Sequence, residues 1–217
     1  MKELPKRATI YASRRYKRAL IFDSKGNNSD RAASFAVRCS MSIPFIFTPQ
    51  RDQGLRVMDG GMQNNYPVSE LLATNPETEF IGLYLGNYYE GMPKEQWLFG
   101  EMLSIWTEAV DVDALNSYKE KTVLIDPRPI RTTDFALTSK EKEFLLSAGR
   151  AAALRFLFKR GVPNGPTEAE VKRSEETANQ LRTEIASIRE KRKRNRMKWA
   201  LLLLIAFSLG AYFFSRS

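Results

Sequence analysis

Histidine is absent from this 217-residue chain, and cysteine occurs only once. Without histidine, the chain cannot contain a Ser-His-Asp triad, a Cys-His pair or a histidine-ligated metal. The single cysteine, Cys39, excludes an intrachain disulfide, and we expect it to be a small buried apolar side chain. Any general base must therefore be a carboxylate, a lysine or a tyrosine, and neither a cofactor nor a metal is expected.

Positive charge is concentrated in two stretches of a chain whose formal net charge is +9. Residues 1–31 and residues 182–198 each contribute +6, so the remainder is net −3. Two basic ends on a slightly acidic body are not typical of a nucleic-acid groove, and aromatic–basic stacking patterns are absent, so no nucleic-acid partner is expected. Basic residues beside an apolar segment are typical of contacts with anionic lipid headgroups.

Extended and helical segments alternate over residues 1–160, which predicts an α/β fold, a sheet with flanking helices. Residue types that suit a pleated surface predict strands at 8–12, 19–22, 45–47, 55–58 and 122–125. The apolar run at 79–85 predicts a buried parallel strand. Helical spacing predicts helices at 31–41, 96–119 and 139–160, and another after Asn64 and Asn65. Asp30, Asn64, Asn65 and Ser139 are the expected caps of these helices.

The composition changes after Gly161, where a linker with two prolines leads into a charged basic helix, together residues 161–198. Within it, Ala178, Leu181, Ile185 and Ile188 form one narrow apolar stripe. The stripe fits either a solvated helix or a short coiled-coil seam.

Residues 199–214 form an uncharged run of 16 residues, which predicts a single transmembrane helix. Six cations precede it, and Trp199 and Tyr212 lie near its two ends, as membrane interfaces favour. The expected location is therefore single-pass and C-terminally anchored, with the body facing the cytoplasm because the basic flank stays on that side. Membrane lipids are then expected both as substrate and as anchor surface, whereas the sequence leaves the oligomeric state open.

Two sequence blocks carry the functional signal. A helix rich in small residues ends in Ser42-Ile43-Pro44-Phe45-Ile46-Phe47-Thr48-Pro49, and Asp59-Gly60-Gly61 follows ten residues later. Together the blocks resemble the patatin-like phospholipase family, and flanking strands extend the resemblance over about residues 1–160. It implies the C-terminal part of a patatin-like acyl hydrolase domain, a partial layered fold.

The resemblance also implies a mechanism, because that family hydrolyses lipid acyl esters with a serine–aspartate dyad that needs no histidine. Asp59 matches the dyad aspartate and is the expected catalytic residue. Gly60 and Gly61 are expected to support the motif by permitting a tight turn and a close backbone approach.

The chain departs from the family at the nucleophile. The family places its serine in a Gly-x-Ser-x-Gly elbow, and this sequence contains no such motif. Ser34, Ser40 and Ser42 belong to the block that packs beside the dyad and are not expected to be nucleophiles. Two functions follow: a lipid acyl hydrolase present here without its nucleophile half, or a catalytically inactive membrane-anchored lipid-binding or scaffold protein.

Overall fold

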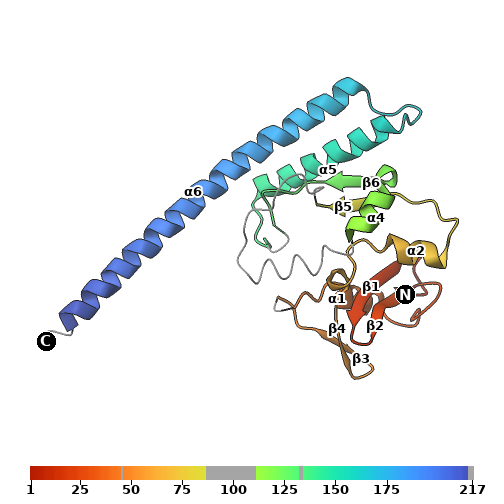
Figure 1. Ribbon diagram of the computed structural model, residues 1–217, viewed down its shortest axis with the longest axis horizontal. Helices are drawn as coiled ribbons and strands as arrows, with labels where there is room; N and C mark the ends of the chain where they lie inside the picture. Colours follow the sequence, from red (N-terminus) through yellow and green to blue (C-terminus); the bar gives the residue numbers. More distant parts are fainter. Residues whose placement is uncertain (45, 87–110, 132–133, 215–217) are drawn as a thin grey trace. The chain divides into compact units, whose positions relative to one another are not determined.

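The computed structural model describes residues 1–44, 46–86, 111–131 and 134–214 (Figure 1). The chain divides into two compact units, one of Met1–Gly82 with Tyr89–Thr122 and the other of Leu83–Tyr88 with Val123–Ser217. Both units contain strands and helices, so the predicted α/β class is confirmed as a mixed α/β fold with a sheet and flanking helices.

The first unit is built on a four-stranded sheet in the order β2-β1-β4-β3. Its strands are β1 (Thr9–Arg14), β2 (Lys17–Asp23), β3 (Gln50–Asp52) and β4 (Leu55–Asp59). All three pairings are antiparallel. Residues with positive φ make the two tight hairpins, Tyr16 before β2, and Gln53 with Gly54 before β4. The sequence pattern does not predict β3.

Helix α1 (Ala33–Ser40) packs against β1 and β4. Its small side chains Ala36 and Cys39 are completely buried with Phe22 and Val57, which brings the helix close to the sheet. Asp30 does not cap this helix, because the N-cap is Ala32 and its side chain accepts no hydrogen bond.

The segment after α1 is a turn and not the expected strand at 45–47. Backbone N–H groups of Ile46 and Phe47 both donate to the carbonyl of Ile43, at 3.2 and 2.9 Å. Phe45 itself lies outside the described residues. Pro44 favours a turn because its ring fixes its own φ and it has no N–H to donate to a neighbouring strand.

Beyond β4, the 3-10 helix η1 (Gly60–Met62) precedes helix α2 (Val68–Thr74). The N-cap of α2 is Pro67, so the prediction that Asn64 or Asn65 caps it is wrong. Asn64 instead accepts the Tyr66 N–H at 2.9 Å and donates to the carboxylate of Glu70. Asn64 therefore forms a local turn before α2 and does not cap the helix.

Most of the helix predicted at 96–119 lies outside the described residues, which contain α4 (Asp111–Ser117) and η2 (Lys119–Lys121) from that stretch. Strands β5 (Gly82–Leu85) and β6 (Thr122–Ile125) form a separate two-stranded sheet. The predicted burial of residues 79–85 is wrong, because Leu83 and Leu85 are 69% and 71% exposed. A two-stranded sheet does not enclose its strands as a wide parallel sheet does.

The second unit is dominated by α5 (Ser139–Lys159) and the 47-residue α6 (Glu168–Phe214), which pack side by side (Figure 1). Thr138, and not Ser139, is the N-cap of α5 and forms a capping box with Glu141. The apolar stripe of α6 is a packed seam, since Ile185 and Ala178 are buried.

Ion pairs fix α6 against the segment that leads into α5. Arg182 donates to the Asp126 carboxylate at 3.0 Å, and Arg189 donates to Asp134 at 2.5 Å. Arg189 also bonds Glu141 at 2.8 Å. Beyond this point, residues 190–199 of α6 are all exposed.

The predicted transmembrane anchor is contradicted. In the part of the chain that the structure describes, no helix combines the length and the apolar character needed to span a membrane. The uncharged part of α6 is 16 residues, or about 24 Å at 1.5 Å per residue, against a hydrocarbon core of about 30 Å. Lengthening it toward the N-terminus adds Lys198 and Arg196. The predicted single-pass location with a cytoplasmic body is therefore wrong.

Candidate active site

Asp59 is the last residue of β4, and backbone contacts on two sides position it. It lies opposite Ala12 in the antiparallel pairing of β4 with β1. Its N–H donates to the carbonyl of Ser42, just beyond α1, at 3.0 Å. The sheet and the end of α1 therefore fix the Cα–Cβ direction of this aspartate, and the two sequence blocks singled out above meet here.

The two carboxylate oxygens of Asp59 have different surroundings. Oδ1 accepts the Gly61 N–H at 2.7 Å and thereby caps η1. Oδ2 accepts no hydrogen bond from the described residues. Burial raises the pKa of the Asp59 carboxyl, and the Gly61 N–H lowers it by less, so the pKa stands above its ordinary value. One oxygen is held, and the other is available to receive a proton.

Both positions after Asp59 are crowded, by backbone at Gly60 and by the Asn65 and Asp59 side chains at Gly61. A Cβ on Gly60 would lie 2.5 Å from the carbonyl oxygen of Tyr11, on β1. A Cβ on Gly61 would lie 2.0 Å from Oδ1 of Asn65 and 2.9 Å from Oδ1 of Asp59. The first contact lets η1 pass close to β1, and the second leaves room for the N–H that holds Asp59.

Two serines lie near the motif, and both hydroxyls are already engaged. Ser42 is 1% exposed and donates to the Arg38 carbonyl at 2.6 Å. Ser13 donates to the carbonyl of Gly60 at 3.4 Å and is also buried. Sequence reasoning missed Ser13, since its contact with Gly60 depends on how β1 pairs and leaves no local pattern.

Cys39 is a buried apolar residue, as predicted. It is completely buried in the core between α1 and the sheet, and burial raises the pKa of its thiol to about 11. A thiol that stays protonated at neutral pH is a poor nucleophile. Among the described residues, no group of three or more Cys, Asp or Glu side chains is arranged to hold a metal ion.

Replacing Asp59 by asparagine is expected to stabilise the fold slightly at neutral pH. Because the folded-state pKa is raised, the folded chain binds more protons than the unfolded chain once pH rises above the unfolded pKa of about 4, and this group's contribution to stability falls as pH rises further. Asparagine keeps an oxygen for Gly61 and carries no charge. Since the Asp59 side chain is only half-buried, the unfolding free energy of the variant should exceed that of the wild type by a few tenths to about 1 kcal/mol, measured by urea unfolding at pH 7.5. The difference between the two proteins should shrink as pH falls toward 4.

Asp126→Asn is the matched control of opposite sign. Burial by itself raises the pKa of Asp126, but hydrogen bonds from Arg128 and the charge of Arg182 together lower it. Its carboxylate therefore stabilises the fold above its unfolded pKa, and this contribution is lost as pH falls. A loss of stability in Asp59→Asn that is as large at pH 4 as at pH 7.5 would contradict the argument.

Comparison with known proteins gives a match to one family model. Residues 3–72 match the family described as patatin-like phospholipase. The matched segment contains the whole four-stranded sheet, α1 and Asp59-Gly60-Gly61, so the resemblance to this lipid acyl hydrolase family is confirmed there. The extension of the resemblance to residue 160 stays a prediction. No curated protein matches the chain.

Proposed function

We propose that residues 1–160 form the aspartate-bearing part of a patatin-like lipid acyl hydrolase, with residues 161–198 as a charged extension. Asp59 is the general base of a serine–aspartate dyad, and Gly60 and Gly61 hold it in place. The observation that carries the proposal is the asymmetric carboxylate, in which Oδ1 accepts the Gly61 N–H and Oδ2 accepts no hydrogen bond from the described residues. The family match over residues 3–72 supports it.

The raised pKa of Asp59 suits a base, because an ordinary carboxylate with a pKa of about 4 is a weak acceptor for a hydroxyl proton. In the first step, Oδ2 takes the proton of the serine hydroxyl while the serine oxygen attacks the ester carbonyl. The leaving alcohol then recovers that proton, and an acyl-serine remains. In the second step, Asp59 takes a proton from water, the resulting hydroxide attacks the acyl carbon, and the serine leaves with the proton.

The nucleophile must come from sequence outside these 217 residues, because they contain no Gly-x-Ser-x-Gly. Within the described residues, Ser42 and Ser13 are buried and hydrogen-bonded, and Ser34 lies on the exposed side of α1. The absence of an elbow also favours the second candidate, a lipid-binding or scaffold protein without catalysis. Coding sequence upstream of Met1 that specifies an elbow would decide for the hydrolase.

A fluorophosphonate probe should not label the 217-residue chain, because it reacts with activated serines and the sequence contains no Gly-x-Ser-x-Gly elbow. The experiment is mass spectrometry of the intact protein after exposure to the probe, with a known serine hydrolase in the same tube as a positive control. The same preparation should release no acid from a short-chain p-nitrophenyl ester above the rate in buffer. Stoichiometric labelling of one serine would reveal a nucleophile within the chain and overturn this part of the proposal.

A further inference from the structure

The four-stranded sheet has one face that α1 covers and an opposite, open face. On the covered face, Val57 of β4 is buried with Ala36 and Cys39 of α1. Because side chains alternate along a strand, Arg56 lies on the opposite face from Val57. Arg51 is directly opposite Arg56 in the pairing of β3 with β4 and shares that face. Both arginines are exposed, so the open face of this hairpin carries two adjacent cations.

The register of the hairpin holds the two arginines side by side. Residues directly opposite in an antiparallel pair have Cβ atoms about 4.5–5.5 Å apart, so Arg51 and Arg56 can reach one phosphate group together. Positive φ angles at Gln53 and Gly54 form the two-residue turn that fixes this register. Like charges in this arrangement destabilise a sheet. Among the described residues, neither guanidinium forms an ion pair or a hydrogen bond, so an anion from outside would relieve the repulsion.

A second turn adds a cation and an aromatic ring at the same end of the sheet. Arg14 lies opposite Val57, so β1 ends where β4 begins. The turn after β1 therefore lies at the same end of the sheet as the turn between β3 and β4. Tyr16 in this turn is 82% exposed, and the Arg15 guanidinium lies 4.8 Å from the centre of its ring. Its φ of 69° is rare for a bulky side chain, so turn geometry alone does not account for a tyrosine here.

The acidic residue next to the β3–β4 turn points away from the two arginines. Asp52 follows Arg51 on β3, so its side chain lies on the covered face. There it is buried and forms ion pairs with Arg14 and Arg31. The carboxylate of Asp52 therefore does not neutralise the positive charge of the open face.

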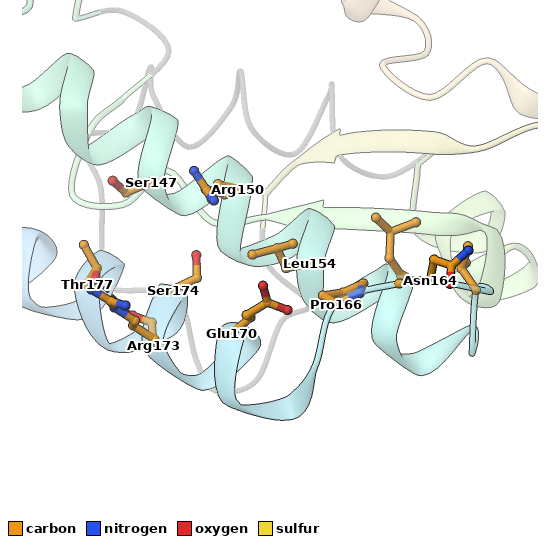
Figure 2. Close-up of a pocket in the computed structure, with 12 residues that line it drawn as sticks. Ser147, Arg150, Leu154, Asn164, Pro166, Glu170, Arg173, Ser174 and Thr177 are labelled. Carbon is orange, nitrogen blue, oxygen red and sulfur yellow. Dashed lines mark hydrogen bonds between the residues drawn. The ribbon is translucent and has the colours of Figure 1, made fainter.

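A groove in the second unit lacks this arrangement. It has a volume of about 710 Å³ beside the loop between α5 and α6, and its lining includes Arg150, Arg173 and also Glu170 (Figure 2). The two arginines belong to different helices, and no strand register holds them opposite each other. Because a carboxylate shares the same walls, the charges of this groove offset one another. The end of the sheet is therefore the better surface for an anion.

We propose that the hairpin end of the sheet, which comprises Arg15, Tyr16, Arg51, Leu55 and Arg56, docks on an anionic phospholipid surface. A planar guanidinium group can donate two hydrogen bonds to one headgroup phosphate. Tyrosine is favoured at membrane interfaces, and Leu55 is exposed beside the arginines. An acyl chain offers Leu55 an apolar contact that the phosphates and sugars of a nucleic acid do not.

This docking surface is separate from the Asp59 motif. Asp59 lies four residues beyond Leu55 on β4, which is about 13 Å at about 3.3 Å per residue. It also lies on the covered face, with Val57. Docking would therefore hold the sheet at a lipid surface without occupying the Asp59 carboxylate. The proposal does not depend on hydrolysis, since a chain without a nucleophile could dock in the same way.

The test places a reporter on the hairpin itself. Leu55→Cys is coupled to an environment-sensitive dye in the 217-residue chain, and labelling is selective because the natural cysteine, Cys39, is completely buried. Vesicles that contain phosphatidylserine should shift the dye emission to the blue, and vesicles of phosphatidylcholine alone should not. The shift should decrease as salt is added, because salt screens exposed charges. The dye reports contact at the hairpin, whatever residues 190–199 bind.

In this labelled background, Arg51→Gln and Arg56→Gln should each raise the lipid concentration needed for half of the shift by about fivefold. This factor corresponds to about 1 kcal/mol for each basic residue at an anionic surface. Arg38→Gln is the matched control and should change nothing, because Arg38 is an exposed arginine of α1, on the covered side of the sheet. Tyr16→Asn should also weaken docking while keeping the turn, since asparagine tolerates positive φ.

Urea unfolding separates docking from a structural role. Arg51→Gln and Arg56→Gln should unfold at the same or a higher urea concentration than the wild type, because each relieves like-charge repulsion. A lower midpoint together with weaker docking would indicate a structural role and count against the proposal.

Three further outcomes would overturn the proposal. The absence of a shift with phosphatidylserine would exclude docking, and equal weakening by Arg38→Gln would reduce the effect to net charge. A larger shift with single-stranded RNA at the same phosphate concentration would make a nucleic acid the partner. None of these results would affect the tests of Asp59, which depend on hydrolysis.

Discussion

Asp59→Asn is expected to abolish ester hydrolysis in a protein that joins this chain to a Gly-x-Ser-x-Gly serine. The asparagine oxygen can still accept the Gly61 N–H, so the turn at Gly60 and Gly61 survives. The amide cannot accept the serine proton, and positioned bases contribute about 10²- to 10⁴-fold to such reactions. The loss should appear in kcat, with KM little changed, because Asp59 acts on the reacting proton and not on the bound lipid.

The measurement is steady-state hydrolysis of a monomeric ester by the wild type and the variant, with the folded fraction of each checked by circular dichroism. Asp30→Asn provides the matched control, because Asp30 is an exposed aspartate of the same unit. This variant should hydrolyse the ester at the wild-type rate. Full activity of Asp59→Asn would show that Asp59 is not the general base and that Asp-Gly-Gly serves only as a structural turn.

Asp52→Ala is expected to cost about 3–5 kcal/mol of unfolding free energy, because it strands a buried cation. Asp52 is 4% exposed and pairs with Arg14, which is 6% exposed, at 3.0 Å. It also pairs with Arg31, at the start of the segment that leads into α1. Without Asp52, the Arg14 guanidinium keeps Gln53 as its one hydrogen-bond partner among the described residues, and its Nε already has none there.

Since small domains have a total stability of about 5–15 kcal/mol, the loss should show as a large drop in the urea midpoint. Arg51→Ala is the matched control on the same strand, because Arg51 is exposed and should change stability by no more than about 0.5 kcal/mol. Similar midpoints for the two variants would show that the buried pair contributes little to stability.

Local patterns predicted single elements well. The strand predicted at 122–125 coincides with β6, and the helix predicted at 139–160 differs from α5 by one residue. Alternating side chains and helical spacing are properties of neighbouring residues, so a sequence displays them directly. Asp59 at the end of a strand was predicted for the same reason.

Pairing between distant segments was not predicted. The antiparallel contact of β1 with β4 depends on which residues meet in space, and no local signal carries that information. The membrane prediction is wrong for a different reason: the run at 199–214 is apolar, but 16 residues are too few. The expected catalytic roles of Asp59, Gly60 and Gly61 remain predictions.

The pairing that positions Asp59 also determines when a working base can exist during folding. Ser13 and Gly60 are in contact although they lie 47 positions apart in the sequence. Closing a loop of this length costs chain entropy before any contact is gained, whereas α1 and the hairpin of β3 with β4 involve only near neighbours. A chain in which those local elements have formed and β1 is still detached would have the aspartate in its sequence but no fixed direction for its carboxylate. Catalytic competence would therefore arise with the last and most non-local step of sheet assembly.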